Sequence, residues 1–274
     1  MFQPVIKWSG SKRTQANELI KYFPDDIDTY YEPFCGGCSM LRTLIESKKK
    51  VNRFVCSDIN EDLINLWLRI KEKPEEVADY YEKLWKELNI DEDKERKKQY
   101  FYSVRDRLNK EHNPLDFMFI MRTTTKGMPR YNKQGEFNNS FHISRNGIIP
   151  DTLRKIIFDW SKLLNTYKVE FRCCSYEDIV PKKNDFVYLD PPYFNTKGMY
   201  YGTLDFDVFW NYLRGLSCQY VLSFDGKSGE VDNTYEVPKD CYSKHEYLCS
   251  GNSSFRRLLG KSKNSIVYES VYVK

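Results

Sequence analysis

The alternation of strand-like and helix-like segments is the feature that most constrains the fold of this chain. A short apolar segment at 29–34 is followed by a glycine-bearing turn, and residues 39–50 then show apolar positions at helical spacing with a basic end. A second strand is predicted at 53–58, and a second helix begins near Asn60. Parallel strands need helical crossovers of this kind, so the order predicts an α/β fold with a doubly wound parallel sheet.

This alternation stops between about residue 72 and residue 150. Residues 74–122 form a long, highly charged helical stretch, and 125–141 are rich in Gly, Asn and Arg, which predicts a β-hairpin or an ordered loop. We therefore expect one α/β domain, formed by residues 1–71 and 151–274, with an insert at 72–150. Asp151 is the predicted N-cap of the helix where the α/β pattern returns. The later predicted elements are strands at 169–174, 185–190, 220–225 and 265–273 and a helix near 206–217.

The composition argues against several classes of protein. No apolar run approaches the roughly 18 residues that a membrane span needs, and the N-terminus has no apolar signal core, so we expect a cytoplasmic protein without a membrane partner. The chain has 8 cysteines, expected to be reduced thiols, and 3 histidines, and its one CxxC at Cys35 and Cys38 has no second ligand pair, so we expect no metal. The net charge of +4 does not by itself indicate a nucleic-acid partner, although a basic face would suit one.

The segment Asp190-Pro191-Pro192-Tyr193 follows the predicted strand FVYL, at the position where open α/β sheets bind ligands. An aromatic amine is a poor nucleophile because its lone pair is delocalised into the ring. The Asp190 carboxylate and the Pro191 carbonyl can accept both amine N–H groups and so point the lone pair at an electrophilic methyl group. The prolines stiffen the loop, and Tyr193 offers a face on which an extruded base can stack. The alternative interpretation is a strand that ends in a rigid proline turn.

Two further segments have the composition of binding loops. Residues 32–39, EPFCGGCS, join the first strand to the first helix, and their small residues allow a cofactor to approach the backbone. Asp58 ends the next strand and suits a ribose diol, a pattern shared with nicotinamide and flavin enzymes. Residues 7–12, KWSGSK, form either a binding loop or a basic loop that caps a helix, and they do not match a Walker phosphate loop.

The order of six motifs resembles the Dam-like family of DNA adenine-N6 methyltransferases, the α-group amino methyltransferases with a DPPY motif. The resemblance extends over nearly the whole chain, from Lys7 to the last strand. DPPY alone is shared with enzymes that act on RNA, on cytosine N4 or on protein glutamine, whereas the ordered set is far more specific. The motifs are KWSGSK (7–12), EPFCGGCS (32–39), SDIN (57–60), RYNKQGEFN (130–138), SYED (175–178) and DPPY (190–193).

This resemblance implies a class I S-adenosylmethionine-dependent methyltransferase with a Rossmann-like sheet and an inserted helical and β-hairpin subdomain for target recognition. It implies S-adenosyl-L-methionine as cofactor, double-stranded DNA as partner, and base flipping at GATC or a related site. The implied catalytic residues are Asp190, Pro191, Pro192 and Tyr193. The implied cofactor contacts are Trp8, Lys12, Phe34, Gly36, Asp58, Tyr176, Asp178 and Asp190.

The implied DNA contacts lie at the N-terminus and in the insert. Lys7 resembles a residue that contacts DNA beside the target adenine, and Arg130 one that recognises guanine O6 and N7 through a bidentate fork. The other implied contacts are Met128 and Asn138. Residues 251–263, with their Ser, Asn and four basic residues, predict a loop over the DNA backbone that includes Arg256 and Arg257. A simple surface loop is the equal alternative.

The chain departs from the family pattern at two places. Cys38 occupies the position of the last glycine in the FxGxG turn, where a side chain restricts the backbone. Thr125-Lys126-Gly127 replaces an aromatic-Asn pair that fills the space left by the flipped base, so Lys126 is expected to contact a phosphate instead.

Three functions stay open at this point. The first is adenine-N6 methylation of DNA in the nucleoid of a bacterial or phage-infected cell, with no obligate protein partner. The second is methylation of another amine, in RNA adenine or at cytosine N4, and the third is a DNA-binding member without activity. The insert with RYNKQGEFN favours the first, and the intact DPPY argues against the third.

Overall fold

The computed structural model describes residues 3–193, 204–229, 231–252 and 266–274, which form two compact units. We name residues 12–57, 175–193, 204–229, 231–252 and 266–274 the sheet unit, and residues 3–11 and 58–174 the helical unit. The expected insert 72–150 falls within the helical unit, and its boundaries stay a prediction. Among the described residues, no helix combines the length and the apolar character that crossing a membrane requires.

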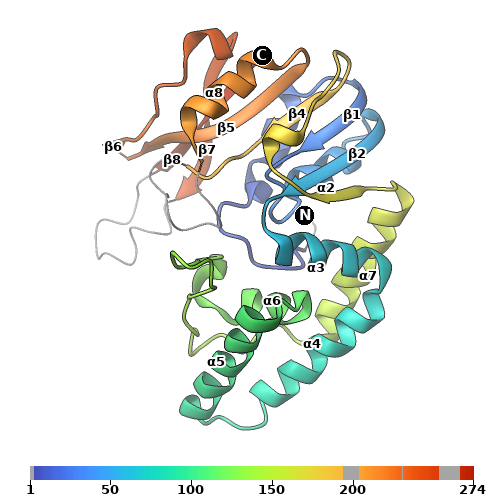
Figure 1. Cartoon of the computed structure of the whole chain (residues 1–274), viewed down its shortest axis with the longest axis vertical. Coiled ribbons are helices and arrows are strands. Elements are labelled where there is room, and N and C mark those ends of the chain that lie inside the picture. Colours follow the sequence, from blue (N-terminus) through green and yellow to red (C-terminus); the bar gives the residue numbers. More distant parts are fainter. Residues whose placement is uncertain (1–2, 194–203, 230, 253–265) are drawn as a thin grey trace. The chain divides into compact units, whose positions relative to one another are not determined.

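The sheet unit contains the mostly parallel sheet that the sequence predicts (Figure 1). Strands β2, β1, β4 and β5 are parallel neighbours in that order, followed by β8 and β7, each antiparallel to the strand before it. The short strand β6 pairs with β5. The bounds are β1 Asp26–Glu32, β2 Lys50–Asp58, β4 Phe186–Leu189, β5 Gln219–Ser228, β6 Val231–Asp232, β7 Lys244–Asn252 and β8 Ile266–Val273. The α/β expectation is therefore confirmed.

Both faces of the central strands are covered, which is why β4 is apolar at all four positions. On one face, α8 (Phe206–Gly215) begins at its N-cap Asp205 and presents apolar residues three and four apart to β4 and β5. The other face bears an aromatic group in which the ring centroids of Phe23 and Phe186 are 4.5 Å apart. The remaining helical segments of this unit are α1 Ala16–Leu19, α2 Ser39–Glu46, η1 Lys12–Thr14, η2 Ile20–Tyr22, η4 Tyr176–Asp178 and η6 Lys239–Cys241.

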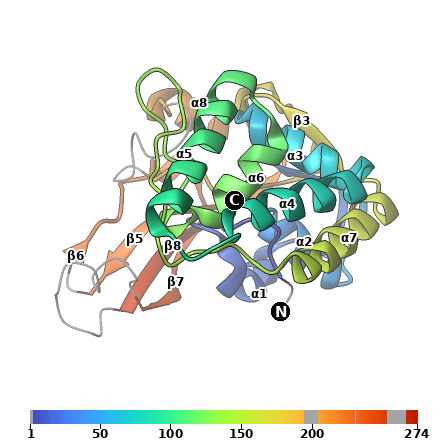
Figure 2. The ribbon, with the colours of Figure 1, turned by 90° about the horizontal axis from the view of Figure 1, so that it is seen from below.

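The helical unit is built around one buried helix. Residues 115–123 of α6 (Pro114–Thr123) are all buried, and α6 contacts α3, α4 and α5 (Figure 2). A helix that is buried on all sides needs other elements around it, and its charged residues Asp116 and Arg122 are bound by Arg107 and by the carbonyls of Pro4 and Val5. The other elements are α3 Glu61–Glu72, α4 Pro74–Leu88, α5 Lys94–Glu111, α7 Pro150–Thr166, η3 Thr125–Gly127 and β3 Glu170–Cys173.

The predicted N-cap at Asp151 is wrong. Helix α7 begins at Pro150 and its N-cap is Ile149, so Asp151 lies in the first turn. Proline is favoured at the first helical position because its fixed φ suits the helix and it has no N–H group to satisfy. The Asp151 carboxylate still lies near the positive end of the helix dipole.

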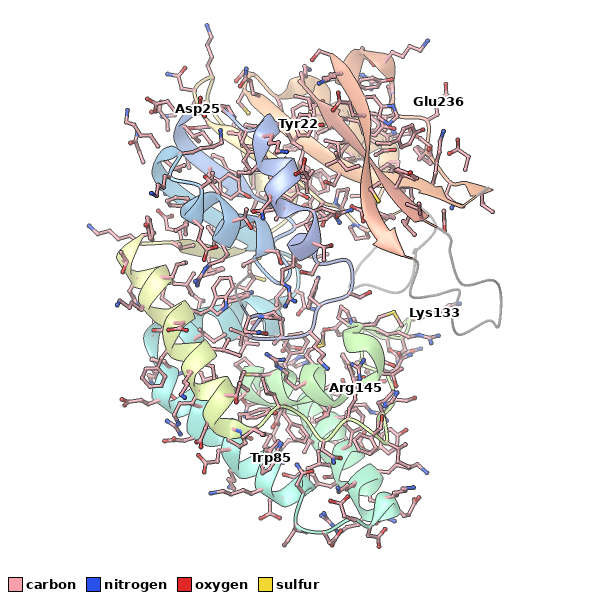
Figure 3. All side chains as sticks on the ribbon, turned by 180° about the vertical axis from the view of Figure 1, so that it is seen from behind. Tyr22, Asp25, Trp85, Lys133, Arg145 and Glu236 are labelled. Carbon is pink, nitrogen blue, oxygen red and sulfur yellow. The ribbon has the colours of Figure 1, made fainter. Side chains whose placement is uncertain are left out.

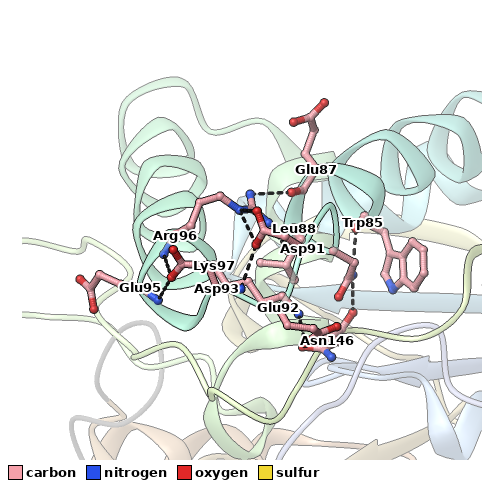
Figure 4. A network of polar contacts seen from close by, with 11 residues as sticks. Trp85, Glu87, Leu88, Asp91, Glu92, Asp93, Glu95, Arg96, Lys97 and Asn146 are labelled. Carbon is pink, nitrogen blue, oxygen red and sulfur yellow. Dashed lines mark hydrogen bonds and ion pairs between the residues drawn. The ribbon is translucent and has the colours of Figure 1, made fainter.

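Charged side chains in the turn between α4 and α5 cap helix ends and pair with one another (Figure 4). Asp93 caps α5 by accepting hydrogen bonds from the Glu95 and Arg96 amides. The Arg96 guanidinium donates to Asp91 and to two carbonyl groups at the end of α4. Lys97 pairs with Glu92 at 2.9 Å. Arg96 and Lys97 of the first turn of α5 are therefore engaged with the protein itself.

Candidate active site

The DPPY segment begins where β4 ends, at the carboxyl edge of the parallel strands. Leu189 pairs with Leu222 of β5, and Val187 pairs with Tyr31 of β1. Asp190 therefore lies between the ends of two parallel neighbours, which is the position that the sequence predicts for a ligand site.

Asp190 forms an ion pair with Lys12. The Lys12 Nζ is 2.7 Å from Asp190 Oδ1, and the two side chains are 3% and 18% exposed. The same ammonium lies 5.1 Å from the centroid of the Tyr193 ring. Burial raises the pKa of Asp190 to about 6, although the positive charge of Lys12 and the nearby Tyr193 hydroxyl act in the opposite direction. The carboxylate is thus largely withdrawn from water, where its electrostatic interactions are stronger than in bulk solvent.

A second carboxylate, which the sequence analysis missed, approaches the same lysine. Glu269 of β8 places Oε2 at 3.6 Å from Lys12 Nζ, and its side chain is 18% exposed. The negative charge of Glu269 raises the pKa values of both Asp190 and Tyr193. An acidic residue within the otherwise apolar terminal strand is the sequence feature that could have indicated it.

The glycine turn is anchored by a third acid, Glu32. Its Oε2 accepts hydrogen bonds from the Tyr30 hydroxyl at 2.8 Å and from the Leu41 amide at 2.9 Å. The N-cap residue of α2, Cys38, makes no side-chain cap, so Glu32 satisfies one of the free amides of the first turn instead. Burial raises the pKa of Glu32 to about 8.

The turn itself needs two left-handed residues. Gly36 has φ 43° and Cys38 has φ 53°, so the departure at Cys38 keeps the conformation for which glycine is usually selected. Cys38 is fully buried, and its thiol interacts with those of Cys35 and Cys56. The Cys35 amide donates to the Ser57 carbonyl at 3.0 Å, which fixes the turn to the end of β2.

Two of the predicted cofactor residues lie together in the sheet unit. The rings of Phe34 and Tyr176 are stacked with centroids 5.6 Å apart, and both rings pack on Phe209 of α8. Asp178 is exposed, and its Oδ2 accepts a hydrogen bond from the Ser175 amide in a capping box. Its carboxylate therefore has a structural role in this turn, and its cofactor contact stays a prediction.

Residues 3–11 of the helical unit hold Lys7 and Trp8. The Arg122 guanidinium donates to the carbonyls of Pro4 and Val5, and the Ser9 amide donates to the Gly127 carbonyl at 3.0 Å. Gly127 has φ +64°, and a Cβ there would be 2.5 Å from the Lys7 Cβ, so only glycine allows this approach. The Lys7 residue is exposed overall, but partial desolvation of its ammonium, together with the positive charges of Arg145 and Arg122, lowers its pKa.

The predicted hairpin in the helical unit is an antiparallel turn closed by isolated bridges at Thr124–Phe141 and Tyr131–Phe137. Arg130 and Asn138, both exposed, are brought side by side by a hydrogen bond from the Asn138 amide to the Arg130 carbonyl at 2.9 Å. Met128 is half-buried. Figure 3 labels Lys133, near the tip of this hairpin, and Arg145, on the segment that leads to α7.

Of the remaining predicted site residues, one has a described side-chain contact and three have side chains outside the described residues. Asp58 accepts a hydrogen bond from the Asn60 amide at 3.0 Å and so opens the turn before α3. Lys126 lies in η3, but its side chain is outside the described residues, as are Arg256 and Arg257. Within the described part of the chain, no group of His, Cys, Asp and Glu residues has the arrangement of a metal site.

A parallel sheet with a glycine turn after β1 and DPPY after β4 defines an α/β fold of the methyltransferase type. The model of the family "D12 class N6 adenine-specific DNA methyltransferase" matches residues 8–244, and the chain belongs to this family. The resemblance to Dam-like adenine methyltransferases is therefore confirmed at the level of the family.

Individual proteins similar in sequence to this chain are named as Type II methyltransferases and DNA adenine methylases. The chain is 33% identical over 207 residues to the Type II methyltransferase M.MjaIII of Methanocaldococcus jannaschii, covering 70% of this chain and 69% of the relative. It is 29% identical over 199 residues to the DNA adenine methylase of Haemophilus influenzae, covering 70% and 64%. An rRNA methyltransferase from Streptomyces viridochromogenes matches in structure with a TM-score of 0.37 and 12% identity, covering 100% of this chain and 85% of that one.

Proposed function

We propose that this protein is a site-specific DNA methyltransferase that transfers a methyl group from S-adenosyl-L-methionine to N6 of an adenine flipped out of double-stranded DNA. The observation that supports this most directly is Asp190, a partly exposed carboxylate at the carboxyl edge of the parallel sheet, paired with the buried Lys12. Membership of an adenine-specific family supplies the substrate class.

Asp190 and Pro191 orient the amine in this proposal. Lys12 occupies Asp190 Oδ1, and a hydrogen bond from N6 to the carboxylate and another to the Pro191 carbonyl would hold both amine hydrogens. Such acceptors favour a tetrahedral nitrogen whose lone pair points at the methyl group. The bound cofactor would supply the methyl group from its sulfonium, with the bonding electron pair left on sulfur, and Asp190 or solvent would accept the proton that N6 loses as it is methylated. Pro192 stiffens the loop, and Tyr193 offers its ring for stacking.

The residues of the sheet unit fit a cofactor with an aromatic base and a positive centre. Phe34, which is half-buried, stacks on the buried ring of Tyr176 near the turn at Gly36. The two negative charges of Asp190 and Glu269 exceed the single positive charge of Lys12. When bound, S-adenosyl-L-methionine supplies a methyl group activated by a positive sulfonium. We propose Phe34, Gly36, Tyr176, Asp178, Lys12 and Asp190 as its contacts, with Trp8 and Asp58 added on the family pattern.

The helical unit is proposed to recognise DNA. Arg130 and Asn138 are exposed neighbours on the hairpin, and Arg130 has the planar fork that recognises guanine in the major groove. Lys7 and Met128 are proposed beside them, with Lys126, Arg256 and Arg257 as phosphate contacts. We propose GATC or a related sequence as the site, and the nucleoid of a bacterial or phage-infected cell, within the cytoplasm, as the location.

Labelled methyl transfer tests the proposal. Purified protein with methyl-labelled cofactor is expected to label double-stranded DNA that contains GATC, with the label recovered as N6-methyladenine. Label in RNA or in cytosine would instead show that another amine is the substrate, and cofactor binding is expected by calorimetry.

The matched pair of variants is Asp190→Asn and Asp25→Asn, since Asp25 is an exposed acid of the same unit (Figure 3). Asp190→Asn should abolish transfer and leave DNA binding largely intact, whereas Asp25→Asn should transfer like the wild type. Normal turnover by Asp190→Asn would refute the role of Asp190.

A further inference from the structure

The position of Glu269 depends on a bulge in the neighbouring strand. The pairing of β5 with β8 passes from Phe224–Ser270 to Lys227–Tyr268, so two residues of β5, Asp225 and Gly226, lie opposite Glu269 alone. A bulge of this kind redirects the side chain opposite it, and bulges are common beside active sites. The close approach needs a glycine, because a Cβ on Gly226 would be 2.1 Å from the Tyr268 carbonyl oxygen and 2.9 Å from the Glu269 Cα.

The result of this approach is one buried ammonium between two carboxylates. Lys12 Nζ is 2.7 Å from Asp190 and 3.6 Å from Glu269, and the lysine side chain is only 3% exposed. A single positive charge cannot fully neutralise two negative ones at these distances, and burial limits screening by water. Glu269 therefore competes with Asp190 for the ammonium, and its own negative charge opposes the ionisation of Asp190.

We propose that Glu269 is a positioning residue of the DPPY site. It acts through Lys12 and sets how strongly the Lys12 ammonium binds Asp190 and how readily Asp190 ionises. This inference rests on the proposed function, in which Asp190 accepts the hydrogen bond of the reacting amine. Lys12 favours the ionised carboxylate and Glu269 opposes it, so the two side chains have opposite effects on the same group.

The other groups that face Asp190 are also in the sheet unit. Glu32 at the end of β1, Tyr188 of β4 and Tyr193 of the loop all interact with it electrostatically. On β5, Asp225 acts on Tyr193. None of these four groups is a cation, so removing Lys12 and removing Glu269 should shift the titration of Asp190 in opposite directions.

The first experiment follows the titration of Asp190 itself, without DNA or cofactor. The protein is labelled with ¹³Cγ-aspartate, and the Asp190 signal is assigned by its loss in Asp190→Asn. Glu269→Gln should shift its titration to lower pH by about half a unit or more, and Lys12→Met should shift it to higher pH. Lys12→Arg retains the charge and should stay near the wild type. The control is Glu236→Gln, an exposed acid of the same unit (Figure 3).

The second experiment measures single-turnover methyl transfer against pH. The acid limb of the pH–rate profile should follow the titration of Asp190, moving to lower pH in Glu269→Gln and to higher pH in Lys12→Met. The rate of Lys12→Met should therefore be reduced less at high pH than at low pH. A merely structural role would lower the rate equally at all pH values. Unchanged Asp190 titration in Glu269→Gln would overturn the proposal. Absence of transfer by the wild type would refute the proposed function instead, while the titration would still test the pair.

Discussion

Replacing Glu32 by glutamine tests the protonation of an acid buried beneath the glycine turn. Glutamine is nearly isosteric, and its amide oxygen can keep the hydrogen bonds from the Tyr30 hydroxyl and the Leu41 amide. The Glu32 side chain is 3% exposed, and burial raises its pKa from 4.5 to about 8. The variant therefore removes a titration while it leaves the packing and both bonds in place.

The raised pKa determines the sign of the effect. Below pH 4.5 the carboxyl group is protonated in the folded and unfolded states, so its titration does not reduce stability there. As the pH rises from 4.5 to about 8, the unfolded chain loses the proton and the folded chain keeps it, so the free energy of unfolding falls by up to about 1.4 kcal/mol per pH unit. Since glutamine does not titrate, the stability of Glu32→Gln relative to the wild type should increase by about 2–3 kcal/mol between pH 6 and pH 9.

Urea unfolding followed by far-ultraviolet circular dichroism measures this difference, with wild type and variant compared in the same buffers and under reducing conditions. Glu18→Gln is the matched control, because Glu18 is an acid of the same unit whose side chain is 58% exposed. If the difference between Glu32→Gln and the wild type stays constant from pH 6 to pH 9, or favours the wild type at high pH, then burial does not hold the proton on Glu32 and the reasoning fails.

Three further substitutions test other parts of the structure. Arg107→Ala should lower the stability of the helical unit by about 3–5 kcal/mol, measured by thermal unfolding, because it leaves the fully buried Asp116 carboxylate without the cation that binds it at 2.6 and 2.7 Å. Gly127→Ala should displace Lys7 and weaken DNA binding in a gel-shift assay, since the new Cβ would lie 2.7 Å from the Lys7 carbonyl oxygen; wild-type affinity would exclude this contact. Arg130→Ala should reduce discrimination at one guanine by about 1–3 kcal/mol in sequencing of methylated DNA, and an unchanged preference would remove that role.

The sequence alone predicts the elements whose hydrophobic spacing and end signals are clear. Helix α8 has apolar residues at 206, 209, 210 and 213 and an N-cap at Asp205, so local spacing alone places it. The first strand was predicted at 29–34, but β1 is Asp26–Glu32, because Pro33 cannot continue the hydrogen bonding and the turn begins there.

The contacts of the site could be predicted less well. Asp190 and Lys12 were both expected in the site, yet nothing in their local sequence shows that they pair with each other. Glu269 could not be placed there at all, since its position follows from a bulge in a strand some forty residues earlier in the chain. Contacts of this range depend on strand order and register, which local composition does not specify.

Cys38 shows that, in this chain, a residue other than glycine occupies the last position of the glycine turn and keeps the left-handed backbone angles. The Cys38 side chain is fully buried, and its thiol interacts with those of Cys35 and Cys56, so burial of this side chain accompanies the left-handed backbone that usually favours glycine. A search pattern that demands a final glycine would pass over such chains, and a pattern that admits small, buried residues there would find them. Relatives with other small side chains at this position should therefore be examined for partners equivalent to Cys35 and Cys56.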